Sequence, residues 1–183
     1  MQASFNRCIF ALNKIVMTFS EWINKVIDSG NLCAEYTVKV NSAKSKKALM
    51  DVCLDSNGSG WLCEMDAKGF TFPYETIKKE FGAFINGRYV AEYEGRNGAK
   101  YTSVLYCCYD DAICEVDTTI ITLLGCNTTL KLKDNSYTFV YADKNCNLVI
   151  DCPKSARCKV ERWGGASIDV IGCESNVDIK SFE

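Results

Sequence analysis

The spacing of apolar residues changes from a helical to a strand period along the chain. Near the start, four apolar residues recur at the spacing of one helix face: Trp22, Ile23, Val26 and Ile27. Thr18 and Glu21 precede them in the order of a capping box, with Met17 placed to pack against Trp22. Gly30 follows where a left-handed residue ends a helix. This pattern predicts a helix that begins directly after Thr18.

Two further helices are predicted before residue 83. The first runs from Ser45 to about Asp55, with Leu49, Val52 and Cys53 facing inward, and ends at Asn57-Gly58. The second begins at Pro73, a favoured first helical residue, and continues through Ile77 and Phe81 to Gly82.

From residue 84 the period becomes that of a strand. Residues 84–93 and 100–108 are aromatic and β-branched runs that flank Asn97-Gly98. Because Asn-Gly readily adopts the positive φ angles of a tight loop, the two runs predict a β-hairpin.

Beyond residue 118, pairs of alternating apolar residues recur every nine or ten residues. They are Ile121/Leu123, Leu130/Leu132, Phe139/Tyr141, Leu148/Ile150, Cys158/Val160, Ile168/Val170 and Val177/Ile179. Turn-forming residues separate them: Gly125, Asp134-Asn135, Asp143 with Asn145, Pro153, Gly164-Gly165 and Gly172. Each pair is expected to face inward from one short strand.

This short period favours a β-solenoid, in which two or three strands form each turn and the inward pairs stack into a narrow core. An antiparallel meander or sandwich is the alternative, since short strands with short turns give a similar spacing. The absence of two-residue Asn-Gly or Asp-Gly loops in the repeat favours the solenoid. The repeat also lacks the pattern of calcium-binding β-helices.

The predicted fold is therefore α+β, with N-terminal helices, a β-hairpin and a β-solenoid-like repeat. We divide the chain into a helical head at residues 17–83, a hairpin link at 84–117 and the repeat at 118–183. Because a capped helix begins so soon after Met17, we hypothesise that residues 1–16 are an appended segment or that the native protein begins at Met17.

Composition removes several classes of chemistry. The chain of 183 residues has no histidine, which excludes Ser-His-Asp and Cys-His nucleophile systems and the histidine-based metal motifs. A net charge of −2 gives no general attraction to nucleic acid or anionic lipid. No apolar run reaches 18 residues, so the sequence predicts no membrane span.

Cysteine is unusually frequent, at positions 8, 33, 53, 63, 107, 108, 114, 126, 146, 152, 158 and 173. The short apolar run after Arg7 is interrupted at Asn13 and Lys14, so we do not interpret it as a signal peptide. We expect a cytoplasmic protein whose thiols are reduced and buried, with a disulfide-bonded exported protein as the alternative. No CxxC pair is present, so no zinc site or other cofactor is predicted.

Three other features have ordinary structural explanations. Cys107-Cys108 is expected to be buried in a strand, since no nearby cation would activate a thiolate. Asp110-Asp111 is expected to be a solvated turn. The tyrosines of the hairpin region are expected to pack within a sheet: Tyr89, Tyr93, Tyr101, Tyr106 and Tyr109.

Candidate protein-binding residues lie in two places. In the segment from Arg157 to Trp163, Cys158 and Val160 should face inward, so that Arg157, Lys159 and Glu161 face outward. Arg162 and Trp163 complete this set, because Arg and Trp are favoured at interfaces. Lys46 and Lys47, with Lys44, form a basic helix surface. The alternatives are a charged strand edge that prevents aggregation and a solvated helix face.

The chain as a whole resembles small proteins from phages and mobile elements of gut Bacteroidota. The similarity lies in the head MTFSEWINKVIDSG, the link FINGRYVAEYEG and the short segments NLVID, CKVER, SIDVI and NVDIK. It implies no catalytic residues.

We therefore expect a non-enzymatic protein-binding module. Its most specific form is a phage-encoded, anti-CRISPR-like inhibitor that occludes a bacterial defence protein in the host cytoplasm. The expected partner is a bacterial effector or a second copy of the chain, with no membrane contact and nucleic acid only through a protein complex. A virion or assembly protein and a cysteine- or carboxylate-based enzyme are the alternatives.

Overall fold

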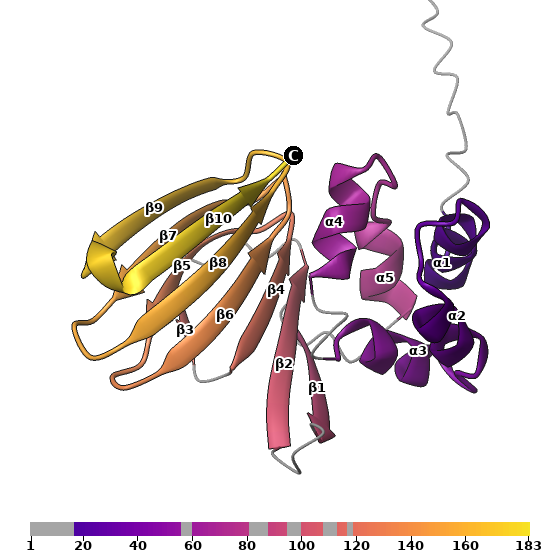
Figure 1. Cartoon of the computed structure of the whole chain (residues 1–183), viewed down its shortest axis with the longest axis horizontal. Coiled ribbons are helices and arrows are strands. Elements are labelled where there is room, and N and C mark those ends of the chain that lie inside the picture. Colours follow the sequence, from indigo (N-terminus) through magenta and orange to yellow (C-terminus); the bar gives the residue numbers. More distant parts are fainter. Residues whose placement is uncertain (1–16, 56–59, 81–87, 95–99, 108–112, 117–118) are drawn as a thin grey trace, which may run out of the picture.

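The computed structural model describes residues 17–55, 60–80, 88–94, 100–107, 113–116 and 119–183 (Figure 1). The hypothesis about residues 1–16 and the prediction for Asp110-Asp111 lie outside the described residues, as does Cys108. The first two described segments form a helical head: α1 (Phe19–Asp28), α2 (Ala34–Asn41), α3 (Lys46–Cys53), α4 (Trp61–Ala67) and α5 (Tyr74–Glu80).

The predicted start of α1 is confirmed. The Glu21 N–H donates to Thr18 Oγ1 at 3.1 Å, and the Thr18 N–H donates to Glu21 Oε2 at 2.7 Å, which completes the capping box. Gly30 follows the helix with a φ of +74°. Met17 packs against the apolar cluster that contains Trp22.

The other two predicted helices are also present. Ser45 caps α3 by accepting a hydrogen bond from the Ala48 N–H at 3.1 Å. Pro73 directly precedes α5, while the expected end at residues 81 and 82 lies outside the described residues. The helices α2 and α4 were not predicted.

The remaining described residues form two sheets. Their strands are β1 (Arg88–Glu94), β2 (Lys100–Cys107), β3 (Ile113–Val116), β4 (Ile120–Leu124), β5 (Asn127–Leu132), β6 (Tyr137–Ala142), β7 (Asn147–Cys152), β8 (Arg157–Trp163), β9 (Ser167–Gly172) and β10 (Val177–Phe182). Sheet A has the order β1-β2-β4-β6-β8-β10, and sheet B has the order β3-β5-β7-β9. A short 3-10 helix (Glu174–Asn176) lies between β9 and β10.

The predicted β-solenoid is confirmed. Only β1 and β2 pair antiparallel, as the predicted hairpin, and every other described pair is parallel. Tyr137 pairs with Arg157 in sheet A, and Asn147 pairs with Ser167 in sheet B. The chain thus alternates between two sheets, and a turn of two strands takes about 20 residues, twice the step of the apolar repeat.

Stacked apolar residues fill the space between the sheets. Ile121, Val140 and Val160 occupy equivalent positions in successive strands of sheet A, and all three are buried. Four of the predicted pairs are buried in this core: Ile121/Leu123, Leu130/Leu132, Leu148/Ile150 and Cys158/Val160. The pairs Ile168/Val170 and Val177/Ile179 in the last strands are partly exposed. Such stacking gives one continuous core along the solenoid.

One predicted inward pair was wrong. Phe139 and Tyr141 lie on the outer face of β6, and Thr138, Val140 and Ala142 take the core positions. Sheets pack only about 10 Å apart, so a narrow interior accepts the small side chains more easily than two aromatic rings. The rings are therefore available on the surface of sheet A.

The helical head packs against part of that same outer face. Leu105 of β2 and Leu124 of β4 belong to one apolar cluster with Leu62 of α4, and Tyr141 and Trp163 pack at its margin. Figure 1 shows the helices gathered on one side of the sheets, with α4 beside the strands. The head therefore covers β2 and β4 and leaves much of β6, β8 and β10 uncovered.

A buried polar junction fixes the head to the solenoid. Asp143, in the turn after β6, accepts hydrogen bonds from the N–H groups of Gly125 at 2.9 Å and Asn145 at 3.2 Å. Lys144 of the same turn places Nζ 3.4 Å from Oδ2 of Asp66 in α4. Both carboxylates are fully buried. Buried charges are stable only with such partners, so these contacts hold α4 and the turn in one arrangement.

Candidate functional site

Strand alternation on β8 presents charged residues on the outer face of sheet A. Cys158 and Val160 are almost fully buried, whereas Arg157 and Lys159 are exposed and Glu161 is half-buried. The predicted orientations along this strand are confirmed. Because the parallel neighbours of β8 hold its backbone on both sides, these side chains project from a rigid surface.

A row of aromatic residues on β6 adjoins these charges. Tyr137 is 45% exposed and packs edge-on against Phe139, with ring centroids 5.1 Å apart. The Lys159 ammonium lies 5.9 Å from the centre of the Phe139 ring. Tyrosine, phenylalanine and arginine side by side on an exposed surface are typical of protein interfaces.

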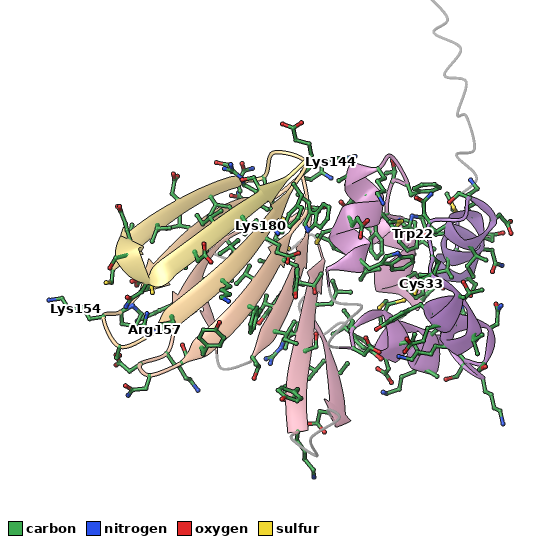
Figure 2. The ribbon with its side chains drawn as sticks, viewed as in Figure 1. Trp22, Cys33, Lys144, Lys154, Arg157 and Lys180 are labelled. Carbon is green, nitrogen blue, oxygen red and sulfur yellow. The ribbon has the colours of Figure 1, made fainter. Side chains whose placement is uncertain are left out.

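We call the surface formed by Tyr137, Phe139, Arg157, Lys159 and Asp178 the outer face of sheet A. A groove of about 270 Å³ crosses it, lined by Phe139 and Tyr141 of β6, by Lys159 and Glu161 of β8, and by Asp178 and Lys180 of β10. Figure 2 labels Arg157 and Lys180 on this part of the solenoid.

Arg162 and Trp163 do not belong to this surface, and their side chains make different contacts. Adjacent residues of a strand point to opposite sides, and the Arg162 guanidinium donates to Ser181 Oγ from Nη2 at 2.8 Å and from Nε at 3.1 Å. Trp163 instead stacks on Phe182 with ring centroids 4.3 Å apart. Arg162 therefore pairs β8 with β10, while Trp163 belongs to the junction with the head.

Lys46 and Lys47 lie apart from the residues of β8. Both are on α3, which Figure 1 places among the helices of the head. Lys46 pairs with Glu80 at 3.4 Å and Lys47 with Asp51 at 2.6 Å. The structure thus separates the predicted binding residues into two surfaces, and the basic charges of α3 are balanced locally.

A second hollow, which sequence reasoning missed, lies between the head and the solenoid. This head–solenoid cleft has a volume of about 410 Å³ and is lined by Asn31, Leu32, Cys33, Tyr36, Gly60, Trp61, Glu64, Tyr141, Glu161 and Trp163. Figure 2 labels Cys33 on the head, well separated from Arg157 at the far end of β8.

Gly60 determines how closely α4 approaches this cleft. A Cβ atom at this position would lie 2.8 Å from the ring of Tyr141 and 3.4 Å from Oε2 of Glu161. Contacts of 2.8 Å are too short for carbon atoms, so a larger residue at this position would require the Tyr141 ring or α4 to shift.

The buried thiols are poor nucleophiles. Burial raises the pKa of Cys158 to about 12 and raises the pKa of Cys53 and Cys63 still further. A hydrogen bond with Cys126 and burial together raise the pKa of Cys146. These side chains remain protonated at neutral pH, as expected for cysteines that serve as small apolar residues.

The remaining described cysteines and the buried Asp66 differ in their exposure. The eight cysteines whose side chains the structure describes are free thiols, of which Cys33 is exposed and Cys173 partly exposed. Burial raises the pKa of Asp66, against the opposing effect of a hydrogen bond from the Phe72 N–H. In the part of the chain that the structure describes, no three cysteine, aspartate or glutamate residues are grouped to hold a metal ion.

The hairpin tyrosines with described side chains are buried or partly buried. Tyr89 and Tyr106 are buried, and Tyr101 is partly buried, as expected for packing residues. The side chains of Tyr93 and Cys107 and the whole of Tyr109 lie outside the described residues.

Comparisons with known proteins give no family for this chain. Among the described residues, no helix has the length and apolar character needed to cross a membrane. No protein-family model, no curated protein and no solved structure matches the sequence or the fold.

Proposed function

We propose that this protein is a non-enzymatic binding module that contacts another protein through the outer face of sheet A. The observation that supports this proposal most directly is the exposed pairing of Tyr137 and Phe139 with Arg157 and Lys159 on adjacent strands. Tyr137 and Phe139 lie on the outer face of β6 beside cationic side chains, and Tyr137 is 45% exposed, although large aromatic residues are usually buried in a sheet.

The rigidity of the surface supports the same proposal. The residues of β8 are hydrogen-bonded to parallel strands on both sides, so ordering them on binding costs little conformational entropy. Its charges are of both signs, with Arg157, Lys159 and Lys180 beside Asp178 and Glu161. A surface of this kind suits a protein partner of mixed charge better than a nucleic acid backbone.

The narrowest form of the proposal is an inhibitor encoded by a phage or mobile element. Such a protein would act in the host cytoplasm by occluding the working surface of a bacterial defence protein, such as a CRISPR effector. The resemblance of the head, link and repeat segments to small phage proteins is its support, together with the absence of histidine. A rigid face of mixed charge is suited to occluding the surface of a partner.

A charge-reversal pair tests the binding surface. Three tagged forms of the full chain would be used to capture proteins from nuclease-treated bacterial lysate: the wild type, Arg157→Glu and Lys131→Glu. Lys131→Glu is the control, because it reverses an exposed charge on sheet B. We expect one stoichiometric partner with the wild type and the control, and its loss with Arg157→Glu. Equal capture by all three forms, or capture of no partner, would contradict the proposal.

A second candidate function is that of a virion or assembly component. In the described part of the chain, β9 and β10 are the last strands of their sheets, and their apolar residues are incompletely covered: Ile171 is 50% exposed and Ile179 is 37% exposed. Strand edges with exposed apolar residues favour pairing between chains. Concentration-dependent oligomers of the wild type, absent in Ile179→Lys, would favour this function over the first.

A further inference from the structure

We propose that the head–solenoid cleft is a binding site for an organic cation, either a small ammonium or guanidinium compound or the Lys or Arg side chain of a peptide. The cleft adjoins the outer face of sheet A and shares Tyr141 and Glu161 with the groove there, but the proposal does not depend on the proposed function. Four aromatic rings and two carboxylates line the cleft, and none of its lining residues is a lysine or an arginine.

The four rings come from four different elements. Tyr36 belongs to α2, Trp61 to α4, Tyr141 to β6 and Trp163 to β8, so both the head and the solenoid contribute to the walls. The face of an aromatic ring carries negative electrostatic potential and attracts a cation within about 6 Å of its centre. Several such rings around one space are the arrangement that recognises quaternary ammonium groups.

Neighbouring side chains hold these rings in place. Trp61 packs edge-on against the buried Trp22 at a centroid distance of 5.5 Å, and Trp163 stacks on Phe182 at 4.3 Å. The Tyr36 hydroxyl donates a hydrogen bond to Asp55. Because the rings are already fixed, a ligand would enter a preformed site and need not order them.

The carboxylates give the cleft its negative charge. Glu161 has no hydrogen-bond or ion-pair partner among the described residues, although it is half-buried. Glu64 pairs with Lys68 at 2.6 Å. A ligand cation between Glu161 and the rings would therefore find a carboxylate that no cation of the described chain already pairs with.

Nearby lysines do not occupy the cleft. Lys39 lies 4.5 Å from the centre of the Tyr36 ring and pairs with Glu35 and Asp55. Lys180 is the neighbour of Glu161 on β10, but its ammonium lies over the Phe182 ring at 4.6 Å. The volume of about 410 Å³ is in the range of small-ligand sites and exceeds what one cationic head group requires.

Titration of the full chain with defined cations tests this site. The probes are tetramethylammonium and the acetylated N-methylamides of arginine, lysine and trimethyllysine, with the citrulline derivative as the neutral analogue of arginine. Tryptophan fluorescence and calorimetry would report binding. We expect saturable binding of at least one cation, about tenfold tighter than that of the citrulline derivative. Tight binding of tetramethylammonium indicates a free small cation, whereas preference for an amino acid derivative indicates a peptide side chain.

Two variants separate binding from folding. Glu161→Gln keeps the size of the side chain but removes its charge, and we expect it to weaken cation binding about tenfold. Glu92→Gln, an exposed change on β1, is the matched control and should bind as the wild type does. Three results would overturn the proposal. They are equal affinities for the citrulline and arginine derivatives, unchanged cation affinity in a folded Glu161→Gln, and no saturation below about 10 mM. Since no partner protein is present, such a result leaves the proposed function intact.

Discussion

The phenol of Tyr74 donates a hydrogen bond to the carboxylate of Asp143, although the two residues are 69 positions apart in the chain. Tyr74 begins α5 in the head, and Asp143 lies in the turn between β6 and β7. Burial and the adjacent charge of Asp143 raise the pKa of Tyr74 far above its ordinary value, so the phenol remains a donor. The bond joins the two halves of the molecule beside the junction formed by Asp66 and Lys144.

This hydrogen bond predicts that substitutions of Tyr74 and Asp143 lower the stability of the fold by different amounts. Tyr74→Phe removes the hydrogen bond to Asp143 and the one that the Tyr74 hydroxyl accepts from the Asn145 side chain at 2.9 Å, and should lower the free energy of unfolding by about 1.5 kcal/mol. Asp143→Ala also leaves the N–H groups of Gly125 and Asn145 without their acceptor and should cost about 3 kcal/mol. Urea unfolding would measure both. Ser155→Ala, at an exposed contact with Asp134, is the control and should change stability by less than about 0.5 kcal/mol. Similar losses for Tyr74→Phe and Asp143→Ala would contradict this account.

Asp66 predicts a pH dependence of stability. Burial raises its pKa in the folded protein above the ordinary value of 3.8, so the folded state binds a proton more tightly than the unfolded state. Its favourable contribution is therefore complete below pH 3.8 and is lost as the pH rises through the raised pKa. We expect the stability of the wild type relative to Asp66→Asn to decrease as the pH increases from about 4 to 7. Denaturant unfolding at several pH values would measure this difference, and an increase would be the opposite result.

Two glycines with the same backbone angle provide a controlled steric test. Gly165 and Gly172 both have a φ of +85°, so alanine at either position carries a backbone strain of about 1 kcal/mol. A Cβ at position 172 would also lie 2.4 Å from the carbonyl oxygen of Cys152, whereas position 165 is open. Gly172→Ala should therefore lower the melting temperature clearly more than Gly165→Ala. Equal shifts would show that the last turn of the solenoid relaxes around the added methyl group.

Differences in burial predict the order of thiol alkylation. Under native conditions Cys33 should react first with iodoacetamide and Cys173 second, because these are the described cysteines with exposed side chains. The buried thiols, including Cys63 and Cys158, should react only after denaturation, since burial also raises their pKa. Peptide mass spectrometry over time would follow each site. Early modification of Cys158 would indicate that the solenoid core opens readily.

The sequence predicted the elements that carry a strong local signal. The solenoid was predictable because strands such as β5, β7 and β8 alternate buried with more exposed residues, and α1 because Thr18 and Glu21 cap it. The helix α2 gave no comparable signal, since its apolar residues do not form one buried stripe and Val38 is 65% exposed. On β6 both faces carry apolar residues, so alternation alone did not decide whether Phe139 or Val140 faces the core.

The two candidate sites also differ in how far the sequence alone could predict them. Arg157 and Lys159 could be assigned to the surface because their neighbours in the strand are apolar core residues. The cleft could not be predicted, since Tyr36, Trp61 and Trp163 are brought together by the packing of the head on the solenoid. No local spacing relates residues that lie so far apart in the chain.

The parallel register of the solenoid also determines how an added repeat would lengthen the fold. Each turn of about 20 residues repeats the geometry of the turn before it, so a tandem duplication of one turn would add one strand to each sheet and lengthen the stack by about 4.8 Å. Inserted near β9 and β10, such a duplication would leave α4 and its contacts with β4 in place. The length of the exposed sheet surface would therefore change by one strand spacing with each duplicated turn. Duplication or deletion of turns in the gene could fit the length of this surface to that of a binding partner.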